Sequence, residues 1–262
     1  MGWLKRFTRH MPELTPDEQM AAARAAAQRH DYDTALALWE PLARDGVARA
    51  QNNIGACFAE GLGVAPNAEL AYRWLSLAAE AGDPVGQRNL AALYFKGEGV
   101  AQDYDCAARL YRAAAEQGDG PAQDMLSWML LEGEVVATDP AEARRWALAA
   151  AAQGIAASMT RLGMLYHNAL TVERDAGEAV RSWRRGAERG DPDGQAMLGA
   201  AYHLGSGISR DPLTAYVWLL RARAGGSSLA ATYLAAVRAS LSPEQIADAE
   251  CRAAAPLPEP QP

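Results

Sequence analysis

The sequence predicts an all-α fold in which antiparallel helix pairs stack into a solenoid of about fourteen helices. One glycine recurs every 36 residues without an insertion, at Gly46, Gly82, Gly118, Gly154, Gly190 and Gly226. Within each period, large apolar residues recur at spacings of three and four, which places them on one face of a helix. Half of the residues are apolar, only 7% are aromatic, and alanine is abundant. This composition favours closely packed helices over sheet.

Residues 15–46 are expected to form a capping helix pair. Thr15, with a proline at the next position, begins the first helix, and Asp31 or Asp33 begins the second. The second helix ends at Gly46, like the second helices of the later units. The first helix has alanines where later units carry larger residues, as expected of a terminal unit that closes a solenoid.

Five full units follow, at residues 47–82, 83–118, 119–154, 155–190 and 191–226. In each first helix, one position holds a large aliphatic residue that we expect in the core: Ile54, Leu90, Leu126, Leu162 and Leu198. The next position is small, which lets the partner helix approach closely: Gly55, Ala91, Ser127, Gly163 and Gly199. The second helices carry large aromatic residues beside a regular alanine, and we therefore interpret most tryptophans as core residues.

The turn inside each unit has its own pattern. Paired glycines at 61 and 63, 97 and 99, and 205 and 207 are suited to positive φ. The second helix then begins after a capping residue: Asn67, Asp103, Asp139, Asp175 or Asp211. Val135 replaces one glycine of the third unit, and Ala169 and Thr171 replace both in the fourth. We therefore expect loops 133–138 and 168–174 to differ in conformation from the other turns.

The C-terminal part is predicted to close the stack. Residues 227–254 form a second capping pair, in which Ser242, followed by proline, begins the last helix. Residues 255–262 are rich in proline and are expected to be extended and solvated.

The unit resembles the Sel1-like repeat, a relative of the tetratricopeptide repeat with a longer loop between its helices. The resemblance rests on the pattern A-x-x-x-L-G-x-x-Y-x-x-G-x-G-V-x-x-D-x-x-x-A-x-x-W/L-Y-x-x-A-A-E-x-G, seen best in residues 47–118 and 191–226. It extends over roughly four-fifths of the chain. It implies a right-handed α/α superhelix whose first helices line a concave surface, where tetratricopeptide relatives bind their ligands.

On that surface, the sequence predicts an apolar centre with a polar, partly basic rim. Such a surface suits a peptide or helix of a partner protein. Trp128 occupies a repeat position at which most units carry alanine; we call such a set of equivalent positions a row. This departure favours partner binding over the alternative, in which a tight superhelical twist buries the apolar centre against neighbouring helices. The candidate partner-binding residues are Asn53, Arg88, Asn89, Phe95, Met125, Trp128, Leu131, Arg161, Met164 and His167.

No set of residues predicts catalysis, a metal or a cofactor. His167 and His203 occupy the same repeat position, but zinc requires three or four ligands. Cys57 lies next to a core position and is expected to be an inert buried thiol. There is no S-x-x-K motif with its companion motifs. We therefore predict that the protein is not an enzyme.

The net charge and the cysteines indicate which partners and which cellular compartment to expect. The formal net charge of −7, from 25 basic and 32 acidic residues, argues against a nucleic-acid footprint. Three cysteines without paired spacing favour a reducing compartment. The N-terminus is a poor signal peptide, and no apolar run approaches the roughly 18 residues of a membrane span. We expect a cytoplasmic protein.

The leading hypothesis is a monomeric, non-catalytic scaffold or adaptor that binds a peptide or helix of a partner protein. The resemblance suggests an alternative, because cysteine-rich Sel1-like relatives are linked to the cell envelope, penicillin binding and β-lactam hydrolysis. Paired cysteines would support that alternative, and this chain lacks them. A self-assembling solenoid is a third possibility, against which the two capping pairs argue. Residues 1–14 form a basic and aromatic arm in which Trp3 or Phe7 is a candidate plug for the groove.

Overall fold

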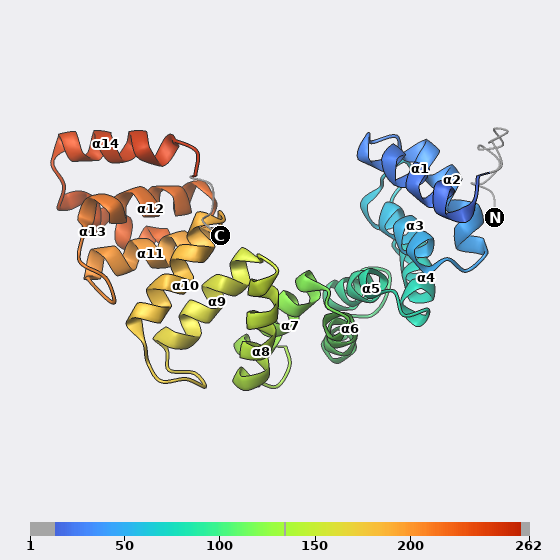
Figure 1. Cartoon of the computed structure of the whole chain (residues 1–262), viewed down its shortest axis with the longest axis horizontal. Coiled ribbons are helices and arrows are strands. Elements are labelled where there is room, and N and C mark those ends of the chain that lie inside the picture. Colours follow the sequence, from blue (N-terminus) through green and yellow to red (C-terminus); the bar gives the residue numbers. More distant parts are fainter. Residues whose placement is uncertain (1–13, 134, 258–262) are drawn as a thin grey trace. The chain divides into compact units, whose positions relative to one another are not determined.

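The computed structural model describes residues 14–133 and 135–257 of the chain. Over these residues it contains fourteen α-helices and no strand (Figure 1), as predicted. The helices are α1 (Pro16–Gln28), α2 (Tyr32–Arg44), α3 (Ala48–Glu60), α4 (Ala68–Glu80), α5 (Pro84–Lys96), α6 (Tyr104–Glu116), α7 (Gly120–Glu132), α8 (Pro140–Ala152), α9 (Ala156–His167), α10 (Ala176–Glu188), α11 (Pro192–Leu204), α12 (Pro212–Ala224), α13 (Ala230–Ala239) and α14 (Pro243–Ala254). The N-terminal arm, apart from Leu14, lies outside the described residues.

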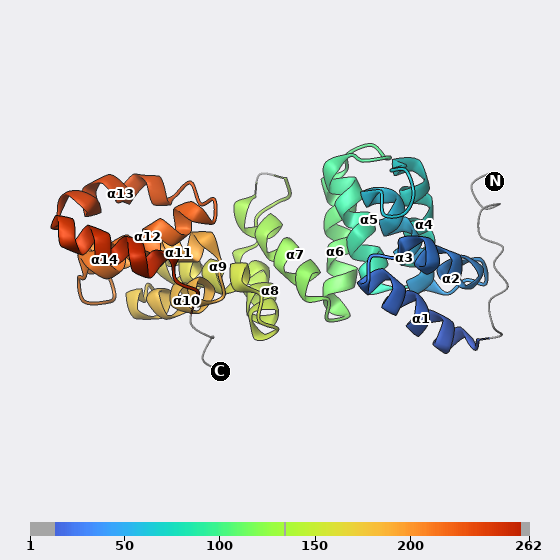
Figure 2. The same ribbon diagram turned by 90° about the horizontal axis from the view of Figure 1, so that it is seen from above.

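The chain divides into two compact units, Met1–Ala122 and Gln123–Pro262, with the boundary inside α7. In the first unit, α3 packs against its pair partner α4 and against α5, the first helix of the next pair. In the second unit, α12 packs against α11, α13 and α14 (Figure 1, Figure 2). Each unit is thus built from antiparallel pairs in which a helix contacts its partner and its neighbours along the chain.

The predicted caps begin the helices. Asn67, Asp103, Asp139, Asp175 and Asp211 each accept a hydrogen bond from the backbone N–H three residues later. Thr15 and Ser242 form full capping boxes, with Glu18 and Gln245 as the reciprocal partners. Asp31, one of the two candidates for the start of α2, is the observed cap.

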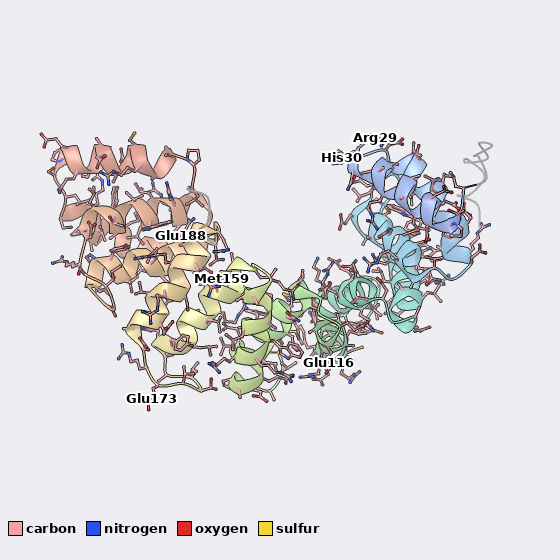
Figure 3. All side chains as sticks on the ribbon, viewed as in Figure 1. Arg29, His30, Glu116, Met159, Glu173 and Glu188 are labelled. Atoms are coloured by element: carbon pink, nitrogen blue, oxygen red, sulfur yellow. The ribbon has the colours of Figure 1, made fainter. Side chains whose placement is uncertain are left out.

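The glycine turns adopt the predicted left-handed backbone, with φ between 70° and 74° at both glycines of the first, second and fifth units. The expectation for loop 168–174, in which Figure 3 labels Glu173, is wrong. Ala169 and Thr171 take φ of 56° and 65°, the conformation of the glycines that they replace. The backbone hydrogen bonds from Leu170 to Leu165 and from Asp175 to Tyr166 also match those of the fifth unit, since the turn closes against the same helix positions. Loop 133–138 includes Glu134, which lies outside the described residues.

The predicted core is confirmed. The aliphatic residues that recur in the first helices, from Ile54 to Leu198, are at most 6% exposed. Trp39, Trp146 and Trp183 are also buried, whereas Trp74 and Trp218 are half-buried and pack on core clusters. The small residues that directly follow these aliphatic residues, here called the small column, allow the partner helix to come close. A Cβ atom added at Gly55 would lie 2.7 Å from Leu75 Cγ, and one at Gly199 would lie 2.8 Å from Leu219 Cγ. Larger residues at these positions would force the two helices of a pair apart.

A recurring glutamine joins the first helices α3, α5 and α11 to the second helix that precedes each of them. The side-chain amide of Gln51 donates to the carbonyl of Ala43 at 3.0 Å, and Gln195 donates to Ala187 at 3.2 Å. Gln87 makes the same contact with Ala79 at 3.5 Å. These carbonyls lie in the last turn of a helix, where no N–H group of the same helix can donate to them. The glutamines therefore add a second hydrogen bond to carbonyls that already accept the N–H of the following glycine, and they link successive pairs.

Candidate partner-binding surface

The ten candidate residues lie on first helices, four in the first unit and six in the second. Asn53 lies on α3, and Arg88, Asn89 and Phe95 lie on α5. In the second unit, α7 carries Met125, Trp128 and Leu131, and α9 carries Arg161, Met164 and His167. All ten are half-buried. The exposed large hydrophobic residues of the described structure lie elsewhere, at Leu77, Leu148, Leu204 and Leu229.

The two candidate arginines are held by carboxylates of their own unit. Arg88 Nη1 donates to Asp119 Oδ2 at 2.9 Å and to Oδ1 at 3.1 Å. Arg161 Nη1 donates to Asp124 Oδ1 at 2.7 Å, and its side chain is only 11% exposed. Because each guanidinium already has a buried or half-buried partner, these side chains connect repeats in the structure and present little free charge to a ligand.

The candidate apolar residues pack partly against their own unit. The Phe95 ring meets Tyr104 of α6 edge-on, with centroids 5.3 Å apart. Leu131 packs on a buried cluster that contains Met159 and Leu165. The His167 ring lies 5.5 Å from the ring of Trp183, and its Nδ1 is buried without a hydrogen-bond partner among the described residues. Their large side chains fill space between helices, which limits the room for a ligand at these positions.

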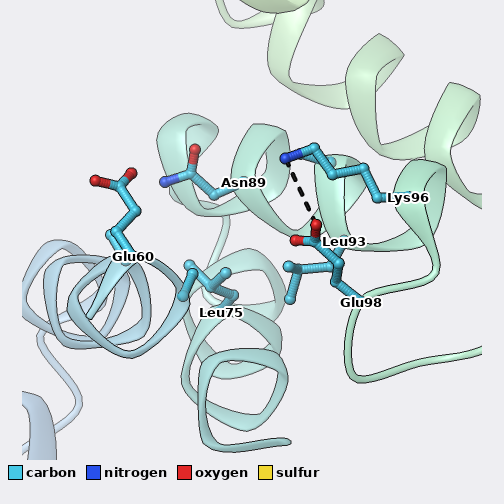
Figure 4. A pocket seen from close by; sticks show the side chains of 9 residues that line it. Glu60, Leu75, Asn89, Leu93, Lys96 and Glu98 are labelled. Atoms are coloured by element: carbon cyan, nitrogen blue, oxygen red, sulfur yellow. Dashed lines mark ion pairs between the residues drawn. The ribbon is translucent and has the colours of Figure 1, made fainter. Parts of the chain in front are cut away.

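A pocket of about 150 Å³ lies between α3 and α5, inside the first unit (Figure 4). Its inner wall is apolar and its mouth is polar. The wall consists of Ala56, Leu75, Ala92 and Leu93, and the mouth consists of Ala59, Glu60, Asn89, Lys96 and Glu98. Lys96 Nζ lies 3.8 Å from Glu98 Oε1.

Of the ten predicted residues, only Asn89 lines this pocket. The sequence prediction selected large side chains, whereas the pocket exists where the same rows carry small ones. Ala56 and Ala92 correspond to Trp128 and Met164, and Ala59 corresponds to Phe95. A search for consecutive alanines in the rows that line the first helices would have located it.

An asparagine ladder runs beside the pocket. Asn89 Nδ2 donates to Asn52 Oδ1 at 2.8 Å, and Asn52 Nδ2 donates to Asn53 Oδ1 at 3.2 Å. Asn52 is only 3% exposed, so the ladder is anchored in the core of the unit. It fixes the orientation of the Asn89 amide at the mouth of the pocket.

Reactive chemistry is sparse over the described residues. No group of three or more His, Cys, Asp or Glu side chains is placed to hold a metal there. All three cysteines are free. Burial, together with the nearby Glu60 charge, raises the pKa of the Cys57 thiol to about 12, so it is protonated at neutral pH. Within residues 14–133 and 135–257, no helix is long and apolar enough to cross a membrane.

Stacked pairs of 36-residue period define the class of protein, an α-solenoid of helical repeats. Five consecutive segments match the Sel1 repeat, at residues 48–83, 84–119, 120–155, 156–191 and 192–227, and the chain belongs to the Sel1 repeat family. Each matched segment begins one residue after the unit predicted from the sequence. Proteins built from Sel1 repeats generally mediate protein–protein interactions and are typically non-catalytic.

Several solved structures are similar to this chain, and one of them supports the same fold. A Sel1 repeat protein from Oxalobacter formigenes has a TM-score of 0.80 and 28% identity, over 92% of this chain and 99% of that one. A Sel1 repeat protein from Klebsiella pneumoniae subsp. pneumoniae has a TM-score of 0.49 and 20% identity, over 76% and 97% of the two chains. Immunity protein Pa5087 from Pseudomonas aeruginosa has a TM-score of 0.48 and 17% identity, over 84% and 86%. Only the first of these scores exceeds 0.5, and the support for the fold comes from that structure. A comparison with curated proteins gave no significant match.

Proposed function

We propose that this protein is a non-catalytic interaction scaffold that binds a peptide or helix of a partner protein along the face formed by its first helices. The α3/α5 pocket is the observation that supports it most directly. Small residues leave room there, the wall is apolar, and the mouth offers an amide and charged groups. Apolar pockets with a few placed polar groups are the usual sites of side-chain recognition.

The candidate residues of the second unit extend the proposal to α7 and α9. Met125, Trp128 and Met164 are half-buried, so part of each side chain is accessible to a partner. Trp and Met are enriched at the centres of protein interfaces. Arg161 acts in this proposal by holding α9 against α7 through Asp124.

Site-specific photo-crosslinking tests the surface. A photo-reactive phenylalanine analogue replaces Lys96, whose long side chain is exposed at the pocket mouth on α5, so that the probe does not fill the pocket. The matched control places the same analogue at Leu77, which is 46% exposed on the second helix α4. In cells of the source organism, we expect a specific protein adduct at position 96 and none at position 77. Adducts confined to position 77 would move the binding surface to the second helices and contradict the proposal.

We also propose that the protein is monomeric and cytoplasmic. The exposed residues of the terminal helices α1 and α14 include Asp17, Glu18, Glu244 and Asp248, and such charged faces oppose end-to-end stacking. Light scattering coupled to size exclusion should give a single-chain mass, and fractionation should place the protein in the cytoplasm. No observation favours the cell-envelope alternative.

A further inference from the structure

The α3/α5 pocket has the size of a single side chain. Its volume is about 150 Å³, and an apolar cavity of that order accommodates a molecule as large as benzene. The room comes from alanines at three positions, because Ala56, Ala59 and Ala92 place only a methyl group where the rows elsewhere carry Trp, Phe or Met. The pocket is therefore suited to one extended side chain of a ligand.

The charge at the mouth is negative. Glu98 is neutralised in part by Lys96, 3.8 Å away. Glu60 comes from the end of α3, on the other side of the mouth (Figure 4), and has no ion-pair partner among the described residues. One uncompensated carboxylate thus stands beside an apolar wall.

The net charge of the whole first unit is also negative. Residues 14–122 contain fifteen Asp and Glu against nine Lys and Arg. An excess of this kind raises the local concentration of basic ligands and speeds their association.

We infer that the α3/α5 pocket binds a lysine or arginine side chain from a basic segment of a partner protein, an inference that rests on the proposed function. The methylene stem lies against Ala56, Ala92 and Leu93, and the cation lies at Glu60. Long basic side chains combine an apolar stem with a charged end, which matches an apolar wall below a carboxylate. Asn89 Oδ1, which takes no part in the asparagine ladder, accepts a backbone N–H of the same segment.

Selection of random 12-residue peptides displayed on phage, panned on the full-length protein, tests the inference. We expect enriched peptides with Lys or Arg at one fixed position. Binding of the synthetic peptide is measured by fluorescence polarisation, together with a version in which norleucine replaces the basic residue. Norleucine keeps the stem of lysine and removes its charge.

Two variants of the protein locate the contact. Glu60→Gln should weaken the basic peptide about two- to fivefold, as expected for an exposed ion pair, and should leave the norleucine peptide unchanged. Glu116→Gln is the matched control, because Glu116 is exposed at the end of α6 (Figure 3) and does not line the pocket. Ala59→Leu fills the mouth and should weaken both peptides more than tenfold, whereas Ala21→Leu at an exposed position of α1 should not.

The other outcomes overturn the inference in distinguishable ways. If Ala59→Leu blocks binding but Glu60→Gln and norleucine have no effect, the pocket takes an uncharged side chain and the proposed scaffold function survives. If no peptide is enriched, or if Ala59→Leu does not change binding, the pocket is not the site, and the crosslinking at position 96 decides the proposed function separately. If a synthetic peptide of residues 1–13 competes with the same dependence on Glu60, the occupant is the chain's own segment and not a partner.

Discussion

Thr171 and Ala169 show how far a repeat can impose its backbone on unsuited residues. Both stand where other units have glycine, and both keep positive φ, at 65° and 56°. For residues with a Cβ atom this conformation costs about 1–2 kcal/mol each. The hydrogen bonds of the turn and the packing of α9 and α10 must compensate for that cost.

Thr171→Gly should therefore stabilise the protein. Relief of the strain outweighs the greater flexibility of glycine in the unfolded chain, for a net gain of about 0.5–1 kcal/mol. Thermal unfolding followed by circular dichroism should show a melting temperature raised by roughly 1–4 °C. Val172→Gly is the control, since Val172 does not have positive φ, and it should lower the melting temperature. A lower value for Thr171→Gly as well would mean that the threonine side chain stabilises the turn.

Cys57 should be chemically inert in the folded protein. It is 2% exposed, and burial raises its pKa to about 12, so that the reactive thiolate is scarce at pH 8. We expect iodoacetamide to modify the exposed Cys251 and to leave Cys57 unmodified until urea unfolds the chain. Peptide mass spectrometry distinguishes the two sites. Rapid native modification of Cys57 would show that α3 opens readily and would weaken the case against a nucleophilic role.

At the scale of the helix pair, the small column sets the distance between the two helices. Gly163 faces Trp183, which is 4% exposed, and a Cβ atom at position 163 would lie 2.4 Å from Trp183 Cδ1 and Nε1. A buried indole ring cannot move aside easily. The close approach of α9 and α10 therefore depends on the absence of one methyl group.

Gly163→Ala should destabilise the protein by about 1–3 kcal/mol, because the added methyl overpacks this contact. Gly177→Ala on α10 serves as the control, since the nearest atoms to its Cβ, on Asp175 and Arg181, are 3.2 Å or farther away. That control should leave stability unchanged or raise it, because alanine favours the helix. Urea unfolding measures both. Equal stability of the two variants would show that the helix pair can widen at little cost.

At the scale of the whole chain, polar side chains bridge successive repeats, but the repeat positions that form the bridge differ from one pair of repeats to the next. Arg49 pairs with Asp83, Arg88 with Asp119, and Arg161 with Asp124. Thr160 donates to Asp191, and Ser227 donates to Asp193, at equivalent places in the second unit. In a solenoid, stability is the sum of each repeat and its nearest-neighbour contacts, so these bridges determine how well adjacent pairs unfold together.

Asp124→Asn tests one bridge. Arg161, whose side chain is 11% exposed, would lose its charged partner, and we expect a loss of about 2 kcal/mol because an uncompensated guanidinium stays half-buried. Glu178→Gln removes a carboxylate from an exposed pair with Arg181, whose side chain is 62% exposed, and should have little effect. Differential scanning calorimetry compares the melting temperatures. Similar values for both variants would mean that the Arg161 bridge adds no stability.

The period, the caps and the core columns were predictable because they are local and repeated. A capping aspartate or an aliphatic residue at a fixed position requires the same environment in every unit, so five copies test one hypothesis. The conformation of loop 168–174 was not predictable by the same logic, because Ala169 and Thr171 prefer another backbone and yield to contacts made elsewhere in the turn. The preference of a residue with a Cβ atom for negative φ is worth about 1–2 kcal/mol. The hydrogen bonds of the turn and the packing of its two helices can contribute more than that.

The proposed binding surface depends on information that the linear pattern does not contain. Periodicity assigns a side chain to a helix face, and this placed the ten candidates on first helices. It does not say whether a large side chain on that face projects into solvent or packs on its neighbour, as Phe95 does on Tyr104. Nor does it show that Arg161 is already paired with Asp124, or that three alanines leave a pocket beside Glu60. Occupied space and paired charge depend on residues from several helices at once, and these meet only when the pairs have packed.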